Sequence, residues 1–253
     1  MRVPTSLARV AGAALDLIAP PRCLACEAED SVHIGLGASC LTLVRPIPLD
    51  PCPVCAAPLG AGAPASACVV CARLTPWFSA SIAGAAYAGL GGELVRRAKY
   101  GRDPLLAFPV AGLLLDVVDE WSAAARIDEV VSVPSTRRRR RERGFNLAEL
   151  IADPIARRLG VPFRPRRLSR VGEPAPQAAL TRPQRRRAAH GTVRVAHQSP
   201  LTRFLFRGHR GVRGRRVLLV DDVLTTGATA NACARALMSA GARDVAVAVA
   251  TRA

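Results

Sequence analysis

The chain has 253 residues, half of them hydrophobic, which is enough for one α/β domain with a smaller appendage. Its formal net charge is +17 and its pI is about 11.2, which favours polyanionic partners such as phosphates, nucleic acid or an acidic membrane surface. No apolar run reaches the length of a membrane span, which excludes a spanning helix.

The first residues combine a basic start with an apolar stretch from Leu7 to Ile18, as a signal peptide would. Asp16 interrupts this stretch, and two prolines and a cysteine cluster follow it. Its apolar residues fall on one helical face, which predicts a short amphipathic helix packed on the body of the protein. Secretion is the alternative, and the cytoplasm is the expected location.

Seven of the eight cysteines lie between residues 20 and 76, and three pairs are spaced C-x-x-C. Two of these pairs, Cys52/Cys55 and Cys68/Cys71, are separated by a short Gly/Ala/Pro-rich stretch. In a cytosolic chain this spacing is typical of a tetrahedral Cys₄ zinc site, whereas redox pairs are the alternative. The predicted zinc ligands of the whole region are Cys23, Cys26, Cys40, Cys52, Cys55, Cys68 and Cys71.

The first pair, Cys23/Cys26, lacks a complete second pair, because only Cys40 follows it and Gly37 stands three residues before Cys40. His33 is one candidate for the fourth ligand. The alternatives are an incomplete site, or a metal shared with another cysteine pair. The eighth cysteine, Cys233, lies in a predicted helix near the C-terminus, and we interpret it as a small buried hydrophobe.

Helices and strands alternate in the middle of the chain, as in α/β proteins. The predicted elements are a helix that ends at Lys99-Tyr100-Gly101, a helix from about Leu105 to Trp121, a strand from Ile127 to Pro134 and a helix from Leu147 to Leu159. Lys99 is the only lysine among the 36 basic residues.

A basic loop is predicted between Pro134 and Leu147, where a strand returns through a helix. It contains an arginine run from Arg137 to Arg141 and then Arg143. The planar fork of arginine suits a pyrophosphate, because it can bind two oxygens at once. A solvated charge run and a nucleic-acid patch are the alternatives.

The stretch from Arg164 to Arg187 is rich in proline, arginine and glutamine and predicts a long mobile loop. A disordered basic linker is the alternative. A strand is predicted from Thr192 to Ala196, followed by a polar connection from Gln198 to Arg215.

The most informative stretch follows this connection. A β-branched run from Arg216 predicts a buried strand that ends in Asp221 and Asp222. A Thr/Gly-rich turn leads to a helix from Ala230 to Ala240, with Gly241 as its C-cap, and a last buried strand spans Asp244 to Ala250.

This strand–turn–helix has the chemistry of a sugar-phosphate site. Unpaired N–H groups and the helix dipole favour a phosphate at the helix start, and Gly227 lets the backbone approach it. Asp221 and Asp222 suit ribose hydroxyls, or water on a magnesium ion. An ordinary turn with Thr229 as N-cap is the alternative.

The stretch Asp221–Thr229 resembles the signature of type I phosphoribosyltransferases, which bind 5-phosphoribosyl-1-pyrophosphate (PRPP). Together with Val133-Pro134, Arg143-Gly144-Phe145-Asn146, Lys99-Tyr100-Gly101 and the Cys-rich start, nearly the whole chain resembles the ComF family. Some of its members are associated with natural competence for DNA uptake. The family pattern has a further cysteine where Gly37 stands here, and an Asn-containing segment where residues 188–191 stand.

The resemblance implies a parallel α/β sheet of the type I phosphoribosyltransferase kind, flanked by helices (77–253), with a small N-terminal zinc-binding domain (1–76). It implies PRPP binding by Asp221, Asp222, Val223, Leu224, Thr225, Thr226, Gly227, Ala228, Thr229 and Arg143. Catalytic roles fall to Asp221, Asp222, Arg143 and Lys99, with Mg²⁺ on the pyrophosphate. By resemblance, the long loop closes over the substrate and contacts it through Arg170, Gln177 and Arg187.

We therefore expect a Mg²⁺-dependent phosphoribosyltransferase, a glycosyltransferase whose acceptor the sequence does not identify. Two alternatives belong to other classes: a single-stranded DNA-binding protein that reuses the fold, and a regulator that senses PRPP without chemistry. Aromatic residues make up only 4% of the chain, so the platforms on which bases stack are few, which weakens the nucleic-acid alternative.

Overall fold

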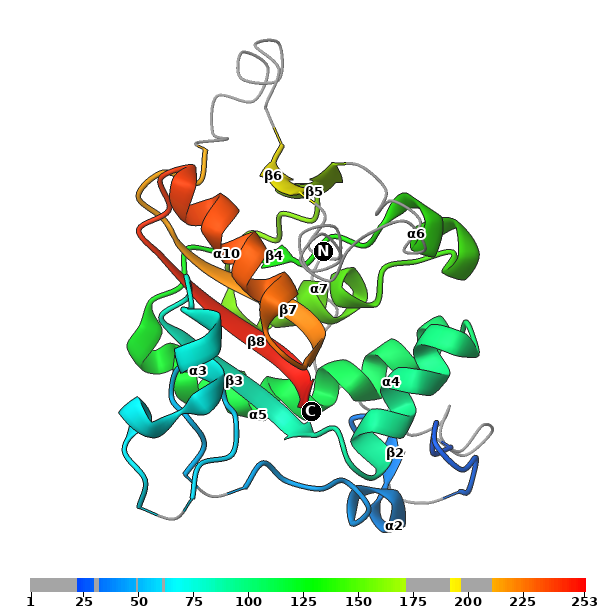
Figure 1. The fold of residues 1–253 in the computed structure, drawn as a ribbon. Coiled ribbons are helices and arrows are strands. Elements are labelled where there is room, and N and C mark those ends of the chain that lie inside the picture. The colour runs from blue at the N-terminus through cyan, green and yellow to red at the C-terminus, as the bar shows by residue number, and fades with distance from the viewer. Residues whose placement is uncertain (1–21, 30–31, 49, 61, 172–191, 197–210) are drawn as a thin grey trace, which may run out of the picture.

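The computed structural model describes residues 22–29, 32–48, 50–60, 62–171, 192–196 and 211–253 (Figure 1). The helix predicted for residues 7–18 lies outside these residues, as do Gln177 and Arg187 and most of the predicted polar connection. None of the helices in the described ranges is long and apolar enough to cross a membrane.

A four-stranded parallel sheet forms the centre of the molecule. In spatial order its strands are β3 (Ala80–Ala86), β8 (Asp244–Arg252), β7 (Arg216–Leu224) and β4 (Glu129–Ser132). A single parallel bridge from Val130 to Phe163 extends the sheet beyond β4. Parallel strands require crossovers, and helices accordingly cover both faces, which confirms the predicted fold class.

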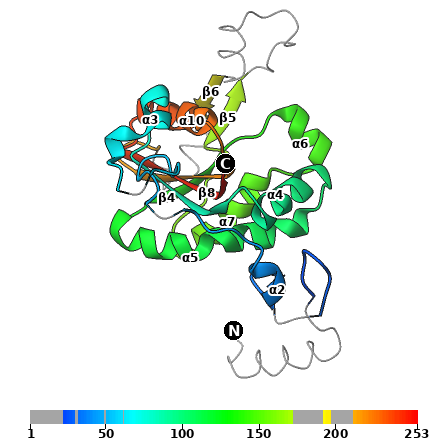
Figure 2. The same ribbon diagram turned by 60° about the horizontal axis from the view of Figure 1, so that its bottom comes forward.

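The two faces of the sheet carry different layers (Figure 2). One face is covered by α4 (Leu90–Tyr100), α5 (Ala107–Ala125) and α7 (Leu147–Leu159), and the other by α3 (Val69–Leu74) and α10 (Ala228–Ser239). In β7, Leu218 and Val220 belong to the first core, and Val217 and Leu219 to the second. This alternation is the period of two expected of a strand buried on both faces.

The strand β3 was not predicted, because its sequence ASIAGAA consists mostly of small residues instead of β-branched ones. The small side chains allow α5 to approach the strand closely. A Cβ at Gly84 would lie 2.0 Å from the carbonyl oxygen of Leu113 in α5. Tertiary packing therefore selects a strand where local propensity gives no signal.

Other boundaries differ from prediction by small amounts. α7 has its predicted bounds, while the helix predicted from residue 105 begins as a short 3₁₀ turn, η2 (Pro104–Leu106), and continues as α5. β7 runs to Leu224 and β8 to Arg252, so Val223 and Leu224 are strand residues. α10 begins two residues earlier than predicted.

The predicted basic loop is in part a helix, α6 (Arg137–Arg143), so that prediction was wrong. The side chain of Thr136 accepts a hydrogen bond from the Arg139 N–H at 3.2 Å and caps the helix. Gly144 ends it in the left-handed conformation. These two caps hold the arginine run in a helix despite its like charges.

A short antiparallel hairpin lies within and beyond the predicted long loop. It pairs β5 (Leu168–Val171) with β6 (Thr192–Val195), and β6 packs against α10. The strand predicted from residue 192 is confirmed, whereas the loop prediction was wrong for residues 168–171 because their cross-strand partners are distant in sequence.

The N-terminal region contains β1 (Val32–His33), β2 (Leu36–Gly37), α2 (Ala38–Leu41) and a 3₁₀ turn, η1 (Ala65–Ala67). Its cysteines divide between the two cores. Cys23 and Cys40 are buried with α4 and α5, whereas Cys52, Cys55 and Cys68 are buried with α10. The Cys-rich region therefore packs on both faces of the sheet.

Candidate functional site

The acidic pair lies near the end of β7, at the edge of the sheet where the parallel strands finish. Successive strand residues point to opposite faces. Asp222 therefore points toward α4, and Asp221 toward α10. Asp222 is buried, with 9% of its surface exposed. Open α/β sheets bind ligands at this edge.

Lys99 meets the acidic pair from the last turn of α4. Its Nζ lies 2.6 Å from Asp222 Oδ1, and the two side chains are only 19% and 12% exposed. Leu94, Val95 and Ala98 are buried and fix this face of α4 on the core. Lys99, the single lysine of the chain, is thus partly buried and forms an ion pair with Asp222, which is predicted to bind ribose.

The environment raises the pKa of Asp221 from 3.8 to about 7. Burial is the largest cause, and the charge of Asp222 adds to it. Lys99, the Asp222 N–H at 2.9 Å and Arg170 act in the opposite direction without offsetting the shift. The pair therefore carries less than two full negative charges in mildly acidic solution.

The Thr/Gly turn after β7 leads directly into α10. Gly227 is the N-cap, with φ of 76°, so the alternative with Thr229 as N-cap was wrong, and the Ala228 N–H donates to Thr226 Oγ1 at 3.4 Å. An added Cβ at Gly227 would lie 2.8 Å from Leu74 Cδ2, the end of a flexible side chain, so the positive φ is the main reason for glycine at this position. The other N–H groups of the first turn have no carbonyl partner within the helix and can serve an anion.

The second cysteine segment supports this turn from both sides. Arg252 is buried and donates from Nε to the Cys55 carbonyl at 3.0 Å and from Nη1 to the Leu224 carbonyl at 2.9 Å. In α10, Asn231 donates to the Leu74 carbonyl at 3.3 Å and accepts from the Trp77 N–H at 2.6 Å. The cysteine segment is thereby tied to both ends of the turn.

A cavity of about 760 Å³ lies between α6 and the β5–β6 hairpin. Its charged lining consists of Arg137, Arg140, Arg141, Arg166, Arg170 and Glu149. Arg140 pairs with Glu149, and Arg170 donates to the Pro134 carbonyl at 2.8 Å. The charge of Arg170 also acts on Asp221, whose pKa it lowers. The cavity is therefore a strongly cationic space, and one of its arginines interacts electrostatically with the acidic pair.

Arg143 lies outside the lining of that cavity and contacts α4 instead. Its guanidinium carbon lies 5.6 Å from the ring centroid of Tyr100, a cation–π distance. Tyr100 follows Lys99, which binds Asp222. The structure therefore joins Lys99 to Asp222 and brings Arg143 against the last residue of α4, the helix that carries Lys99.

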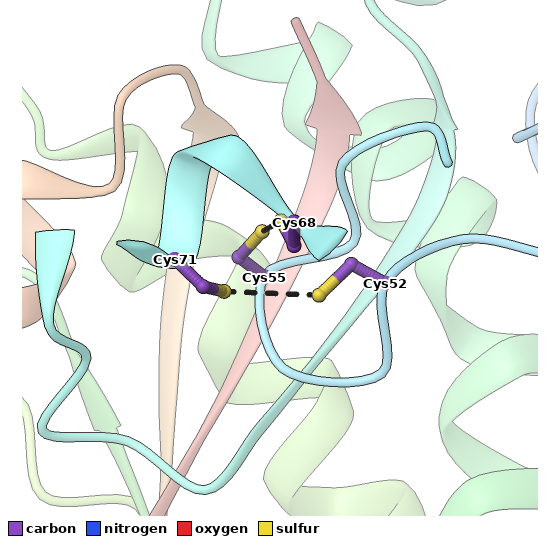
Figure 3. A group of neighbouring side chains, drawn as sticks. All are labelled: Cys52, Cys55, Cys68 and Cys71. Carbon is purple, nitrogen blue, oxygen red and sulfur yellow. Dashed lines mark hydrogen bonds between the residues drawn. The ribbon is translucent and has the colours of Figure 1, made fainter. Parts of the chain in front are cut away.

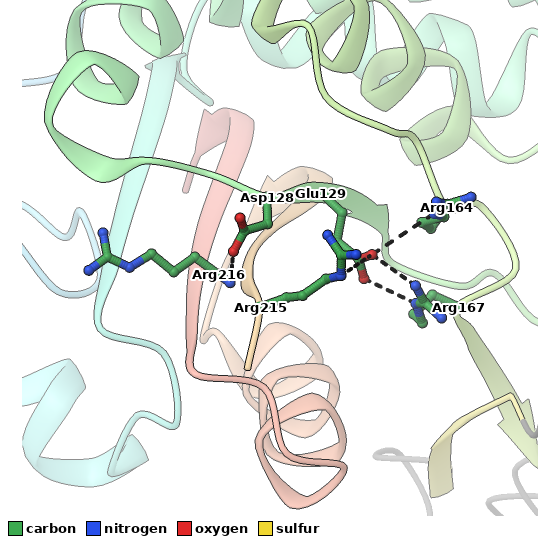
Figure 4. Close-up of polar contacts among 6 residues, drawn as sticks. All are labelled: Asp128, Glu129, Arg164, Arg167, Arg215 and Arg216. Carbon is green, nitrogen blue, oxygen red and sulfur yellow. Dashed lines mark hydrogen bonds and ion pairs between the residues drawn. The ribbon is translucent and has the colours of Figure 1, made fainter. Parts of the chain in front are cut away.

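A buried ion network anchors the β5–β6 hairpin at the other end of β4 (Figure 4). Glu129 is 1% exposed and accepts from Arg167 Nε at 3.0 Å and Nη2 at 2.8 Å. Arg164 and Arg215 lie 3.9 Å and 3.8 Å from the same carboxylate. Arg167 precedes β5, so the network positions the strand that carries Arg170.

The second cysteine cluster has the geometry of a complete zinc site (Figure 3). The sulfur atoms of Cys55 and Cys68 lie 3.5 Å apart and those of Cys52 and Cys71 3.7 Å apart. Tetrahedral zinc thiolates require an S···S spacing of about 3.8 Å. Burial opposes ionisation of Cys68, but the Cys71 N–H and the neighbouring thiols lower its pKa to about 7. These four residues fit a structural zinc ion.

The first cysteine cluster brings together Cys23, Cys26 and Cys40. Cys26 is exposed, and its sulfur lies 3.4 Å from that of Cys40. His33 is exposed and is not part of the cluster, so the structure does not support it as the fourth ligand. The two clusters are separate, which excludes a metal shared between the cysteine pairs.

Three residues that support the candidate site were not predicted from the sequence. Arg252 and Asn231 act through bonds to partners more than 150 positions away, which no local pattern reveals. Glu129 looked like an ordinary strand residue. A carboxylate in an otherwise apolar strand was the one signal that a buried ion pair was present.

Two families match the chain: the phosphoribosyl transferase domain over residues 146–253 and the double zinc ribbon domain over residues 14–74. DNA utilization protein YhgH of Salmonella typhi is 30% identical over 235 residues, which cover 91% of this chain and 96% of the relative. Competence protein F of Haemophilus influenzae is 26% identical over 232 residues, covering 89% and 94%. The crystal structure of adenine phosphoribosyltransferase from Thermoanaerobacter pseudethanolicus matches with a TM-score of 0.31 at 20% identity, covering 53% of this chain and 76% of that one.

Proposed function

The chain belongs to the ComF family of phosphoribosyltransferase-domain proteins, and from this premise we propose that it binds PRPP and transfers the phosphoribosyl group. The observation that carries the proposal is the acidic pair, with Lys99 bound to Asp222, followed by the glycine turn that begins α10. One edge of the sheet thus offers a phosphate site, acceptors for vicinal hydroxyls and a cation.

In this proposal the 5′-phosphate binds the turn from Thr225 to Thr229. Its N–H groups and hydroxyls donate to the phosphate oxygens, and the dipole of α10 favours the negative charge. The ribose hydroxyls donate to Asp221 and Asp222, which accept hydrogen bonds when ionised. Val223 and Leu224 are the strand residues that hold the carboxylates and the turn at a fixed spacing.

The pyrophosphate faces Lys99, Arg143 and the arginine-lined cavity. When pyrophosphate departs from C1 with the bonding electrons, an oxocarbenium-like centre remains, and a nucleophile of the acceptor attacks it. Positioned cations stabilise the leaving group, so catalysis is mainly electrostatic. Bound Mg²⁺ would neutralise pyrophosphate charge. The 4-residue strand β5 brings Arg170 to the same space.

The test of the binding site is titration calorimetry of the zinc-loaded protein with PRPP and Mg²⁺. Asp221→Asn/Asp222→Asn should weaken binding by at least about 100-fold, because two charge-assisted hydrogen bonds contribute about 1.5–3 kcal/mol each. Asp119→Asn is the matched control, since Asp119 pairs with Arg158 on the surface. Equal affinities in the wild type and the double variant would contradict the proposal.

Turnover separates an enzyme from a sensor. An enzyme releases pyrophosphate when PRPP is supplied with a panel of nitrogen nucleophiles, and the double aspartate variant does not. A protein that binds PRPP tightly but releases no pyrophosphate with any acceptor is a PRPP-sensing regulator. The names of two relatives, DNA utilization protein YhgH and Competence protein F, support our proposal that either activity serves DNA utilisation.

A second candidate function is binding of single-stranded DNA, which the five arginines of the cavity lining favour. Binding through phosphates gives a steep salt dependence of affinity. Arg137→Ala/Arg141→Ala should lower the slope of log affinity against log salt by about 0.7 for each phosphate of a single strand that the variant no longer neutralises. An unchanged slope would exclude the cavity as the DNA site.

We also propose a cytoplasmic location. The cysteines of both clusters form no disulfides and are arranged as zinc ligands, and reduced cysteines persist in compartments that glutathione and thioredoxin keep reducing. Labelled fusion protein found outside the cytoplasmic fraction would contradict this.

A further inference from the structure

The two cysteine segments follow the same backbone path in their first halves. The Cys23 N–H donates to the Ala28 carbonyl at 3.0 Å, and the Cys52 N–H to the Ala57 carbonyl at 2.8 Å. An isolated antiparallel bridge flanks each turn, and the residue after each second cysteine has a positive φ, 64° and 52° respectively. Cys23 and Cys26 therefore correspond to Cys52 and Cys55.

The second halves also correspond. Cys68 is the N-cap of α3, with φ of −70°, and Cys71 follows three residues later. In the first segment the N-cap of α2 is Gly37, with φ of −69°, and Cys40 follows three residues later. Gly37 therefore stands at the structural position of the fourth zinc ligand.

The sulfur contacts reflect this difference. In the second cluster, Cys55 pairs with Cys68 at 3.5 Å. In the first cluster the corresponding partner has no side chain, and Cys26 contacts Cys40 instead, at 3.4 Å. Cys55 is buried, whereas Cys26 is exposed. Among the described residues, the first cluster thus lacks the ligand that position 37 would supply; Gly37 itself is buried, and Cys26 is the exposed member of the cluster. The cluster does not fit the closed four-thiolate site that a double zinc ribbon implies.

We propose that the first cluster is a three-thiolate zinc site whose fourth coordination position is open to an external soft ligand, a thiol or an imidazole. Zinc in proteins is four-coordinate, and sites with three protein ligands keep the fourth position for an exogenous group. Thiolates select soft metals and co-ligands. The exposed side at Cys26 gives such a ligand access. This inference does not depend on PRPP binding.

The first experiment counts zinc in the full-length protein by native mass spectrometry after dialysis against a chelator. The wild type should retain one zinc ion, and Gly37→Cys should retain two. The φ of −69° at Gly37 lets cysteine replace it without backbone strain. The gained ligand should strengthen the weaker zinc-binding step by at least about 100-fold, since even loss of an outer-shell partner costs 10–100-fold.

Gly37→Ser is the matched control, because it adds a side chain of similar size without sulfur and should still retain one ion. Two chelator-resistant zinc ions in the wild type would overturn the proposal, since another part of the chain would then complete the site. One ion in Gly37→Cys, with the fold intact by circular dichroism, would overturn the assigned correspondence with Cys68.

The second experiment tests whether the fourth position is open. The wild type is loaded with two equivalents of Co²⁺, and free imidazole is added while the visible absorption is recorded. Imidazole should change the spectrum of the wild type and leave that of Gly37→Cys unchanged. A wild-type spectrum insensitive to both imidazole and 2-mercaptoethanol would show a closed site and would contradict the proposal.

Discussion

At the scale of single residues, the protonation state of Asp221 has opposite effects on stability and on the proposed ligand binding. The neutral carboxyl group favours the folded state, whereas the ionised group is the form that accepts hydrogen bonds from ribose hydroxyls. The pKa of Asp221, about 7 in the folded protein, lies above the 3.8 of the unfolded chain. Between these values the native state holds a proton that the unfolded state has lost. Stability from this group is therefore fully present below pH 3.8 and falls as the pH rises to about 7.

Asp221→Asn should remove this dependence. At pH 8 the variant should melt at least about 2–4 °C above the wild type, which is the effect of 1 kcal/mol in a protein of this size. The gain should vanish toward pH 4, where the wild-type carboxyl is also neutral. Differential scanning calorimetry across this range is the measurement, and a pH-independent difference would contradict the assigned pKa.

Lys99 should control that titration. It lowers the pKa of Asp221 by its charge, so Lys99→Met should move the midpoint of the pH-dependent stability to higher pH. Lys99→Arg keeps the cation and should leave the midpoint near its wild-type value. The same calorimetry measures both variants. A midpoint that stays unchanged in Lys99→Met would show that the charge of Lys99 does not affect the pKa of Asp221.

At the scale of elements, the sequence predicts what local chemistry determines. The apolar run of β7, the acidic pair and the glycine turn could be predicted because each has a signal within a few residues. β3 and β5 could not, because small residues and distant partners form them. The Lys99–Asp222 pair joins residues 123 positions apart, so the sequence predicts its members and not their contact.

Arg252 should support the phosphate turn through its two carbonyl contacts. Arg252→Met leaves the Cys55 carbonyl without this donor, at a cost of about 1–3 kcal/mol, whereas the Leu224 carbonyl keeps its bond from the Ala253 N–H at 3.0 Å. Urea unfolding should report the loss, with weaker PRPP binding in parallel. Arg158→Met, which alters an exposed pair, is the control. Equal stability of the two variants would exclude the support role.

Glu129 should hold the β5–β6 hairpin in place. Glu129→Gln leaves the buried Arg167 uncompensated and should destabilise the protein by roughly 3–5 kcal/mol. Glu129→Leu/Arg167→Leu should recover part of that loss, because the most deeply buried arginine is removed together with its partner, whereas Arg164 and Arg215 still lose the carboxylate. Urea unfolding of the three proteins measures the recovery. A double variant as unstable as the sum of two single losses would argue against the network.

At the scale of the whole molecule, the cysteine-rich region is integrated with the sheet. We propose a division into residues 1–76 and 77–253, yet the first part packs on both faces of the second. Calorimetry of the zinc-loaded protein should therefore show one cooperative transition. Two separate transitions would contradict this integration.

Removal of zinc should affect the turn from Thr225 to Thr229, the proposed phosphate site. Metal binding at structural sites contributes directly to folding. The second cluster is tied to the turn through Arg252 and Asn231, so loss of its zinc should lower the melting temperature and weaken PRPP binding together. Titration of protein treated with a strong chelator measures this. Undiminished PRPP affinity in zinc-free protein would show that the contacts do not couple the two sites.

The pairing of Lys99 with Asp222 has a practical consequence for protein chemistry. Lys99 carries the only side-chain amine of the chain, and that amine lies in the candidate site with the side chain 19% exposed. An amine-specific acylating probe therefore has one side-chain target in the folded protein, Lys99. A ligand bound at the site should protect Lys99, and the labelling of the single peptide that contains it would report ligand occupancy. The arginines on the surface do not react with such reagents, so they add no background labelling.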